Sequence, residues 1–233
     1  MRPELLSALN DARRERRAAV LVTAMESGEQ RLVTPDMLAS DPLGEAIDTA
    51  IRNGKSALVE HEGASYFLTV QVPPVRIVVI GAVHISQALA PMAKLAGFDM
   101  TIVDPRTAFA TPERFPDVPV IADWPETVLP PMKIDRYTAI ACFTHDPKID
   151  DPALEEALRA ECFYEGALGS RKTHAKRLER LTAKGFTADD FARIKAPIGL
   201  DIGAVTPSEI AVSVLGEIIL ALRKKPLRAE KAA

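Results

Sequence analysis

The sequence predicts an α/β fold, a parallel sheet with helices on both faces, preceded by a small α+β subdomain. Apolar, strand-like runs alternate with helical patterns from Arg76 onward. Such alternation is typical of parallel sheets, because each pair of parallel strands needs a crossover connection. Pro73-Pro74 precedes this region, and neither a helix interior nor a central strand tolerates a proline pair. We therefore expect an N-terminal subdomain over residues 1–72 and the larger domain over residues 75–224.

The composition is that of an ordinary globular protein. The chain has 233 residues, 47% hydrophobic and 26% charged, with a formal net charge of −3. It therefore offers no general attraction to nucleic acid or to an anionic membrane. The longest apolar stretch, Ile210 to Leu222, is too short to span a membrane and contains Glu217. The N-terminus has no continuous apolar core, which argues against a signal peptide. Neither a nucleic-acid partner nor an integral membrane segment is expected.

The two cysteines, Cys142 and Cys162, both lie in apolar, strand-like runs. Free thiols in such runs are usually buried, and we prefer this interpretation to a redox role. The sequence therefore predicts buried free thiols and a reduced, cytoplasmic location.

The N-terminal subdomain is expected to combine helices with short strands. Its first helix is charged, and we interpret the cluster Arg13–Arg17 as a solvated face, since no aromatic residues interleave it as in a nucleic-acid site. Asn53-Gly54 is a good C-cap pair, and Glu62-Gly63 links two strands as a hairpin. The expected helices span 3–17 and 43–52, and the expected strands span 18–24, 31–33, 56–60 and 66–72.

The larger domain is expected to alternate strand and helix to its end. Its last helix has a strong start signal, because Thr206-Pro207-Ser208-Glu209 combines an N-cap, a proline at the first helical position and a capping-box glutamate. Residues 225–233 are expected to form a frayed tail. The expected strands span 76–80, 100–104, 118–121, 137–143 and 162–166, and the expected helices span 84–96, 150–160, 170–184, 188–194 and 206–223.

The turn after the expected strand 76–80 matches a dinucleotide-binding fingerprint that lacks its middle glycine. The apolar run ends in Gly81, a helical pattern follows, and the next strand ends in Asp104, which is the layout of a Rossmann-like mononucleotide-binding unit. The second glycine of the fingerprint lets a pyrophosphate approach the backbone, and here it is Val83. The third glycine, needed for close helix–strand packing, is Ser86. We therefore expect a Rossmann-like fold that binds NAD(P) weakly or not at all.

Ligands of open α/β sheets bind at the carboxyl ends of the strands, and this rule selects the candidate binding residues. Gly166 and Gly169 precede a helix that begins with Ser170 and Arg171, and helix N–H groups beside cations predict an anion-binding turn. The same glycines also suit a plain turn with positive φ before an exposed basic face. The candidate cofactor-binding residues are Gly81, His84, Asp104, Arg106, Thr144, His145, Asp146, Gly166, Gly169, Ser170, Arg171 and His174.

Several of these residues have more than one interpretation. His145 and Asp146 are the candidate catalytic acid–base pair, but adjacent residues usually point apart, and Asp146 is equally suited to capping its own loop. Asp104 would accept a ribose hydroxyl in a dinucleotide site, or it is simply a polar strand end. His84 is either a pocket wall or solvent-facing. No tight ligand spacing links His84, His145 and His174, so no metal site is expected.

Five separated motifs follow one another along the chain: Gly81-Ala-Val-His84, Val103-Asp104-Pro-Arg106, Thr144-His145-Asp146-Pro147-Lys148, Gly166-Ala-Leu-Gly169-Ser-Arg171-Lys-Thr-His174 and the stretch from Ala196 through Asp201 and Thr206 to Ala211. Together they closely resemble the C-terminal Rossmann-like domain of the XdhC/CoxI family over about residues 76–223. The family usually has Gly-Ala-Gly-His where this chain has Val83. Long members also carry an N-terminal Gly-Ser-Ser-Pro-Arg stretch and a Gly-Cys-x-Glu motif that residues 1–72 lack, so the chain resembles a short or divergent member.

The resemblance implies an accessory factor that transiently binds the molybdenum cofactor, as molybdopterin or its dinucleotide form. It also implies help with inserting or sulfurating that cofactor in a molybdenum hydroxylase of the xanthine dehydrogenase or CO dehydrogenase type. The implied partners are the hydroxylase apoenzyme, a sulfur-transferring desulfurase and a second copy of the chain. Because the N-terminal family cysteine is absent, we do not expect this chain to handle sulfur alone, and we favour a non-catalytic chaperone. An NAD(P)-binding oxidoreductase of Rossmann type and a docking protein without a ligand remain the alternatives.

Overall fold

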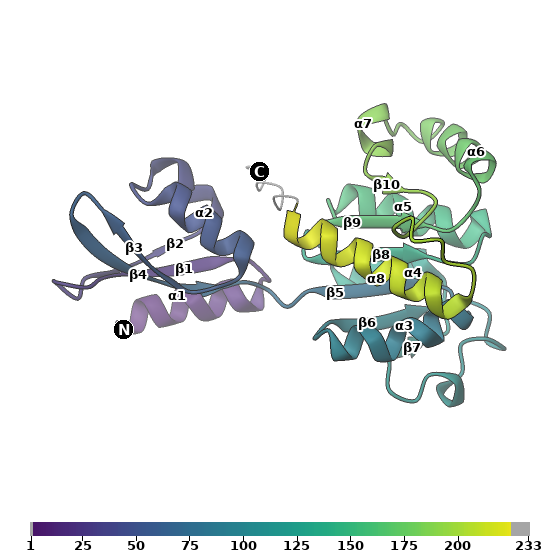
Figure 1. The fold of residues 1–233 in the computed structure, drawn as a ribbon, viewed down its shortest axis with the longest axis horizontal. Coiled ribbons are helices and arrows are strands. Elements are labelled where there is room, and N and C mark those ends of the chain that lie inside the picture. The colour runs from purple at the N-terminus through teal and green to yellow at the C-terminus, as the bar shows by residue number, and fades with distance from the viewer. Residues whose placement is uncertain (1, 225–233) are drawn as a thin grey trace. The chain divides into compact units, whose positions relative to one another are not determined.

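The computed structural model of the chain describes residues 2–224, which divide into two compact units (Figure 1). The smaller unit is residues 2–73 and the larger is residues 74–224. The predicted frayed tail, residues 225–233, lies outside the described residues.

The smaller unit is a four-stranded antiparallel sheet, in the order β2-β1-β4-β3, with two α-helices packed on it. Leu9 and Ala12 of α1 pack against Ala19 and Leu32, and α2 packs against β1 and β4. The elements are α1 (Pro3–Arg14), β1 (Ala19–Ala24), β2 (Gln30–Val33), the 3-10 helix η1 (Pro35–Ser40), α2 (Gly44–Asn53), β3 (Ala57–His61) and β4 (Ala64–Gln71).

The backbone confirms the turn signals of this unit. Gly54 ends α2 in the left-handed conformation, with a φ of 62°. Glu62 and Gly63 have φ values of 50° and 80°, as a tight hairpin turn requires. The first helix ends at Arg14 instead of residue 17, because Arg16 adopts a φ of 54°, which a right-handed helix does not allow.

The larger unit confirms the predicted fold class. Its six strands form one parallel sheet in the order β10-β9-β8-β5-β6-β7, and helices cover both faces (Figure 1). From β5 the chain adds β6 and β7 on one side, and then returns to add β8, β9 and β10 on the other side. The position between β5 and β8 is therefore the topological switch point. The elements are β5 (Arg76–Ile80), α3 (His84–Leu95), β6 (Asp99–Val103), η2 (Pro112–Arg114), β7 (Val120–Ile121), α4 (Pro125–Met132), β8 (Thr138–Cys142), α5 (Pro147–Arg159), β9 (Tyr164–Ala167), α6 (Arg171–Thr182), α7 (Ala188–Phe191), β10 (Ile194–Lys195) and α8 (Pro207–Lys224).

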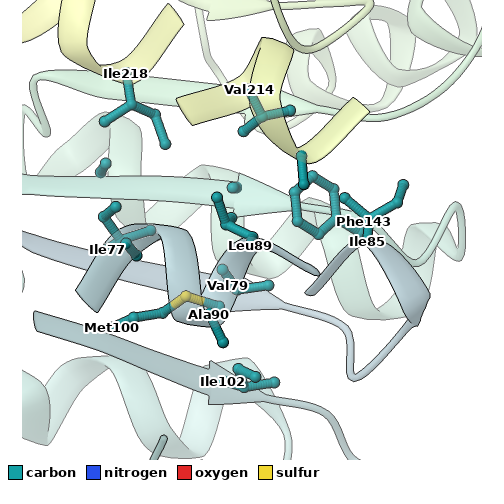
Figure 2. Close-up of a cluster of buried hydrophobic side chains, with 14 of the residues drawn as sticks. Ile77, Val79, Ile85, Leu89, Ala90, Met100, Ile102, Phe143, Val214 and Ile218 are labelled. Atoms are coloured by element: carbon teal, nitrogen blue, oxygen red, sulfur yellow. The ribbon is translucent and has the colours of Figure 1, made fainter. Parts of the chain in front are cut away.

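The alternating side chains of β5 supply two cores. Val78 and Ile80 join the core beneath α4 and α5, whereas Ile77 and Val79 join the core beneath α3 and α8, as the two-residue period of a strand dictates. Every residue of β5 after the first is therefore apolar. Figure 2 shows the second core, in which the side chains around Ile77 and Val79 include Leu89, Ala90, Met100, Ile102, Val214 and Ile218.

Three helix starts follow from local chemistry. Thr206 and Glu209 form the predicted capping box of α8, with N–H to oxygen distances of 2.9 Å and 3.3 Å. α5 begins at Pro147 instead of residue 150, because the Asp146 carboxylate accepts the Lys148 N–H at 2.9 Å and caps the helix. No helix was predicted where α4 lies, because three prolines in so short a segment are typical of a loop. α4 begins with Pro125 in its first turn, where the missing N–H costs nothing.

The predicted helix over 188–194 is shorter than expected. α7 ends at Phe191, and Ile194–Lys195 pairs in parallel with β9 as the edge strand β10. Cys142 and Cys162 are buried free thiols, as predicted. No helix among residues 2–224 is long and apolar enough to cross a membrane.

Candidate functional site

Parallel pairing aligns the ends of the four central strands. Ile80 of β5 lies opposite Val103 of β6 and opposite Cys142 of β8, and Cys142 lies opposite Ala167 of β9. The loops that follow these strands therefore emerge at one edge of the sheet, which we call the carboxyl edge. Three of these loops are called here the β5, β8 and β9 loops: residues 81–83, 143–146 and 168–170.

The β5 loop touches the β8 loop at the switch point. Gly81 has a φ of 117°, and a Cβ at this position would lie 2.9 Å from Cγ2 of Thr144, so the close approach requires glycine. The buried Ser86 hydroxyl donates a hydrogen bond to the Gly81 carbonyl. Ser86, which replaces the third glycine of the fingerprint, thus fixes the turn. Val83 is half-buried and packs against the core beneath α3 and α8.

Asp104 is fully buried and bound on all sides. Its Oδ2 accepts the N–H of Ala82 at 2.7 Å and Nη2 of Arg106 at 2.7 Å. Its Oδ1 accepts the backbone N–H and Nε of Arg106, each at 2.9 Å. Burial alone would raise the pKa of this carboxyl, but the hydrogen bonds from Arg106 and Ala82 outweigh it, so the pKa is lowered. Of the two interpretations of Asp104, the acceptor of a ribose hydroxyl does not suit a carboxylate whose oxygens each already accept two hydrogen bonds.

The loop after β6 is fastened to the β5 loop. The guanidinium of Arg114 donates to the carbonyl oxygens of Ala82 and Phe109, both at 2.8 Å, and to Oε1 of Gln87 at 3.2 Å. Arg106 stacks on the Phe109 ring with its Cζ 4.6 Å from the centroid. Arg114 and Phe109 were not candidates from sequence, because a lone arginine and an exposed aromatic residue carry no motif.

The β8 loop has an exposed histidine at its tip. His145 is exposed and adopts a φ of 62°, which is uncommon for a residue with a side chain and often marks a functional position. Thr144 donates to Oδ1 of Asp150 at 2.6 Å and accepts the Asp146 N–H at 3.1 Å. Because the Asp146 carboxylate caps α5, the capping interpretation of Asp146 is confirmed.

The β9 loop leads into the amino end of α6, beside His145. Gly169 has a φ of 135°, and a Cβ there would lie 3.8 Å from Nδ1 of His145. Ser170 caps α6 by accepting the Thr173 N–H at 3.2 Å. Arg171 is exposed in the first turn. The amino end of α6, with its positive dipole end and a cation, thus opens onto the carboxyl edge next to the β8 loop.

Gly166 does not belong to this turn, contrary to expectation. It lies inside β9, opposite Ala141 of β8 and Lys195 of β10. A Cβ at Gly166 would lie 2.5 Å from Cδ1 of Ile198 and 2.7 Å from the Tyr164 hydroxyl. The glycine is required for close packing on the sheet face.

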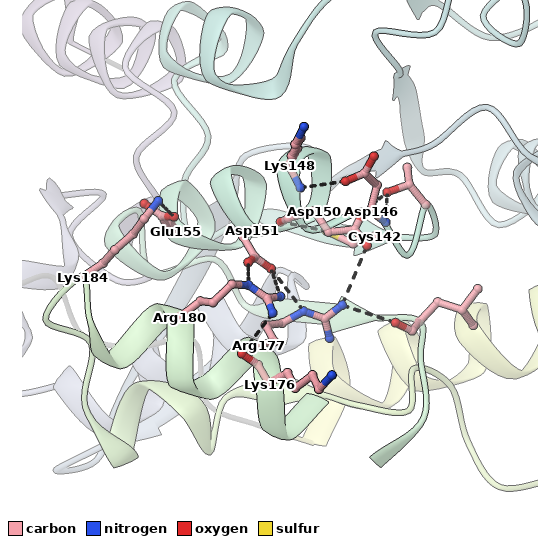
Figure 3. A network of polar contacts seen from close by, with 12 residues as sticks. Cys142, Asp146, Lys148, Asp150, Asp151, Glu155, Lys176, Arg177, Arg180 and Lys184 are labelled. Carbon is pink, nitrogen blue, oxygen red and sulfur yellow. Dashed lines mark hydrogen bonds and ion pairs between the residues drawn. The ribbon is translucent and has the colours of Figure 1, made fainter. Parts of the chain in front are cut away.

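A buried ionic network lies behind the β8 and β9 loops (Figure 3). Arg177 of α6 is 2% exposed, with Nη2 3.8 Å from Oδ2 of Asp150 and Nε 3.6 Å from Oδ1 of Asp151. It also donates to the Leu168 carbonyl at 3.4 Å. Burial raises the pKa of Asp150, whose Thr144 and Arg177 contacts only partly counteract it. The network links the β8 loop to the β9 loop. The basic face expected on α6 is therefore not wholly solvated, since Arg177 turns inward.

The remaining candidates differ in exposure. His84 is exposed at the start of α3, whereas His174 of α6 is half-buried. Burial and, secondarily, Arg177 lower the pKa of His174. Burial raises the thiol pKa of both Cys142 and Cys162 well above the ordinary value. Among residues 2–224, no group of three or more His, Cys, Asp or Glu side chains is arranged to hold a metal ion.

Comparison with known proteins gives several relatives. Over 181 residues, 75% of this chain and 33% of the relative, the chain is 34% identical to the uncharacterized protein YqeB of Escherichia coli strain K12. It is 32% identical over 146 residues, 63% of this chain and 40% of the relative, to the molybdenum cofactor insertion chaperone PaoD of the same strain. It is 33% identical over 148 residues, 63% of this chain and 43% of the relative, to a probable xanthine dehydrogenase subunit of Bacillus subtilis strain 168. The chain thus spans less than half the length of each of these relatives.

A crystal structure of a xanthine dehydrogenase from Bacillus halodurans has the same fold, with a TM-score of 0.64 at 21% identity. The similarity covers 95% of this chain and 65% of that one. Residues 77–218 match the family described as the XdhC Rossmann domain, in agreement with the motifs at the carboxyl edge. The chain therefore belongs to the XdhC Rossmann-domain family.

Proposed function

We propose that this chain binds the molybdenum cofactor, as molybdopterin or its dinucleotide form, and delivers it to a molybdenum hydroxylase of the xanthine dehydrogenase or CO dehydrogenase type. Membership of the XdhC family supports the proposal. So do the names of two relatives, one a molybdenum cofactor insertion chaperone and the other a probable xanthine dehydrogenase subunit. A cytoplasmic location and recognition of the hydroxylase apoenzyme are parts of the same proposal.

The observation that carries the proposal is the amino end of α6, which opens onto the carboxyl edge beside the β8 loop. The N–H groups of Arg171 and Lys172 lie in the first turn and have no acceptor within the helix. Two cationic side chains accompany them. This combination suits the phosphate of a pterin–phosphate ligand, and Gly169 lets the chain turn there without a side chain in the way.

The heterocyclic end of such a ligand would lie toward the switch point. His84, which follows the β5 loop, and His145, in the β8 loop, are both exposed. Imidazole rings can both stack on a flat heterocycle and donate hydrogen bonds to it. Arg106 follows β6 at the same edge, with its guanidinium paired to Asp104.

The proposed role is binding and transfer, without turnover. Sulfuration of the cofactor needs a reactive sulfur donor, and thiolate character decides thiol reactivity. Both cysteines of the chain are buried with raised thiol pKa values. Any sulfur transfer is therefore assigned to a separate desulfurase that would meet the loaded protein.

Two experiments test the proposal. Purified chain is titrated with molybdopterin and, in parallel, with reduced nicotinamide cofactor, each followed by fluorescence; saturable binding of molybdopterin alone is expected. The client hydroxylase is then assayed for activity and cofactor content in cells with and without the chain. A client that stays fully loaded and active without the chain contradicts the accessory role. Conversion of a small molecule by the purified chain, abolished in His145→Ala, would make it an enzyme.

A further inference from the structure

The N–H of Ala82 in the β5 loop already has an anionic partner, the carboxylate of Asp104 in the same unit. In dinucleotide-binding sheets the N–H groups of this loop, at the start of the first helix, receive the pyrophosphate. Here the Ala82 N–H donates to the Asp104 carboxylate at 2.7 Å, away from solvent. The carboxylate thus occupies the position in which a phosphate oxygen would be stabilised.

The neighbouring cation is committed to the same carboxylate. Nε and Nη2 of Arg106 both donate to Asp104, at 2.9 Å and 2.7 Å, which is the paired geometry that guanidinium groups form with carboxylates or phosphates. A phosphate at this loop would have to compete with an intramolecular carboxylate for both an N–H and a guanidinium. It would also place its charge next to the ionised Asp104.

The surrounding loop holds this arrangement in place. Phe109 packs on the Arg106 guanidinium, and Arg114 bonds the Ala82 carbonyl and Gln87 of α3. The Asp104 carboxylate is therefore held at the loop, because the Ala82 N–H and carbonyl and the Arg106 guanidinium are each fixed by a further contact.

We propose that Asp104 is a built-in anion that closes the β5 loop to phosphate-bearing ligands, nucleotides included, and leaves the amino end of α6 as the anion-binding position of this sheet edge. Asp104 is thus a specificity-determining residue. Val83 replaces the second glycine of the dinucleotide-binding fingerprint, but its side chain packs against the core. The residue that excludes phosphate is the acid at the end of the neighbouring strand.

The first test uses the wild-type chain and inorganic pyrophosphate, with the backbone amides followed by nitrogen-15 NMR. Saturable shifts are expected for the amides of Gly169 to Lys172, with none at Ala82 and Val83. Saturable shifts at Ala82 in the wild-type chain overturn the proposal. If the α6 amides also fail to shift, the anion site of the proposed function is wrong, while the closure of the β5 loop by Asp104 still stands.

The second test opens the loop. In Asp104→Ala the Ala82 N–H and the Arg106 guanidinium lose their acceptor, so pyrophosphate is expected to bind there at least about ten-fold more tightly than in the wild-type chain, with new shifts at Ala82. Glu113→Ala is the matched control, because it removes an exposed carboxylate from the loop between β6 and β7 without freeing the Ala82 N–H or the Arg106 guanidinium. A folded Asp104→Ala that gains no more than this control contradicts the proposal. Should Asp104→Ala not fold, the wild-type titration alone decides.

Discussion

Two aspartates at the carboxyl edge, Asp104 and Asp150, meet opposite environments although both are fully buried. Burial acts to raise the pKa of both carboxyls, but at Asp104 the hydrogen bonds from Arg106 and Ala82 outweigh it and the pKa is lowered, whereas at Asp150 burial prevails and the pKa is raised. The difference lies in donor geometry: Arg106 makes direct hydrogen bonds, but Arg177 approaches Asp150 only to 3.8 Å. Asp104, whose hydrogen-bonding capacity is filled, closes the β5 loop. Asp150, which is less well satisfied, links the β8 loop to the β9 loop through Arg177.

Arg171 is the residue whose loss should separate ligand binding from stability. Arg171→Ala is expected to weaken molybdopterin binding by about 1.5–3 kcal/mol, the range for a hydrogen bond to a charged group. The melting temperature should hardly change, because Arg171 is exposed. Lys176→Ala is the matched control, since Lys176 is an exposed cation on the same helix beyond its first turn. Titration calorimetry of both variants checks the prediction, and equal affinities would mean that Gly169 and Ser170 serve the turn alone.

His174 should make the stability of the larger unit depend on pH. Its pKa is lowered from 6.5 in the folded state, so the neutral form is favoured there. The stabilisation is complete above the unfolded pKa and is lost as pH falls through the folded pKa. The melting temperature of the wild-type chain should therefore drop as the pH falls below 6.5, the ordinary pKa of histidine, and that of His174→Gln should drop less. His84→Gln, at an exposed histidine, should keep the wild-type profile; a profile unchanged by His174→Gln would exclude His174 as the source.

The buried pair Asp150–Arg177 should show strong coupling. Breaking a buried pair from one side costs about 3–5 kcal/mol, because a charge is left unpaired, so Asp150→Asn and Arg177→Met should each lower the free energy of unfolding strongly. The double variant should lose clearly less than the sum of the two. Urea unfolding of all four proteins measures this coupling. Additive losses would mean that Asp151, 3.6 Å from Arg177, is the true partner.

At the scale of elements, Gly166 of β9 lies near the candidate site but is explained by packing. Gly166→Ala should cost about 1–3 kcal/mol of unfolding free energy, the range for overpacking, since the new Cβ would meet Ile198 and Tyr164. Ile198→Ala removes both the Cδ1 and the Cγ1 that would lie 2.5 Å and 2.6 Å from that Cβ. Gly166→Ala should therefore cost less in the Ile198→Ala background than in the wild-type chain, which is a partial recovery. Chemical denaturation measures both. No loss in Gly166→Ala, or no recovery in the double variant, would contradict the packing explanation.

The sequence predicted the elements whose signals are local. Hydrophobic runs placed β5, β6, β8 and β9, and the cap of α8 placed its start within one residue. α4 was missed because its prolines outweigh its apolar residues in any local pattern. β10 was missed because two residues become a strand only beside β9.

The candidate site was only partly predictable for the same reason. The strand-end rule found the loops around Gly81, His145 and Gly169, since it needs only strand positions. The contacts of Asp104 with Ala82 and of Arg177 with Asp150 join segments distant in sequence. The sequence does not distinguish Arg177 from the other basic residues of α6, although it is the one that is buried.

At the scale of the whole molecule, the larger unit contains everything that its proposed site requires. Both cores of its sheet are built from residues between Ile77 and Leu222, and all the loops of the carboxyl edge belong to it. A fragment of residues 74–224 is therefore expected to fold cooperatively and to bind molybdopterin within about three-fold of the full chain, a difference below 1 kcal/mol.

A shorter fragment that ends before Thr206 is the matched control. It keeps every loop of the carboxyl edge but lacks α8, whose Ala211, Val214 and Ile218 are buried in the core beneath α3 (Figure 2). Exposing the apolar surface that these residues cover should prevent cooperative folding, since each fully buried aliphatic side chain contributes about 1.5–3 kcal/mol. Circular dichroism melting and molybdopterin titration of both fragments decide the matter. If the fragment of residues 74–224 folds but binds no molybdopterin while the full chain does, the assignment of the whole site to the larger unit is wrong.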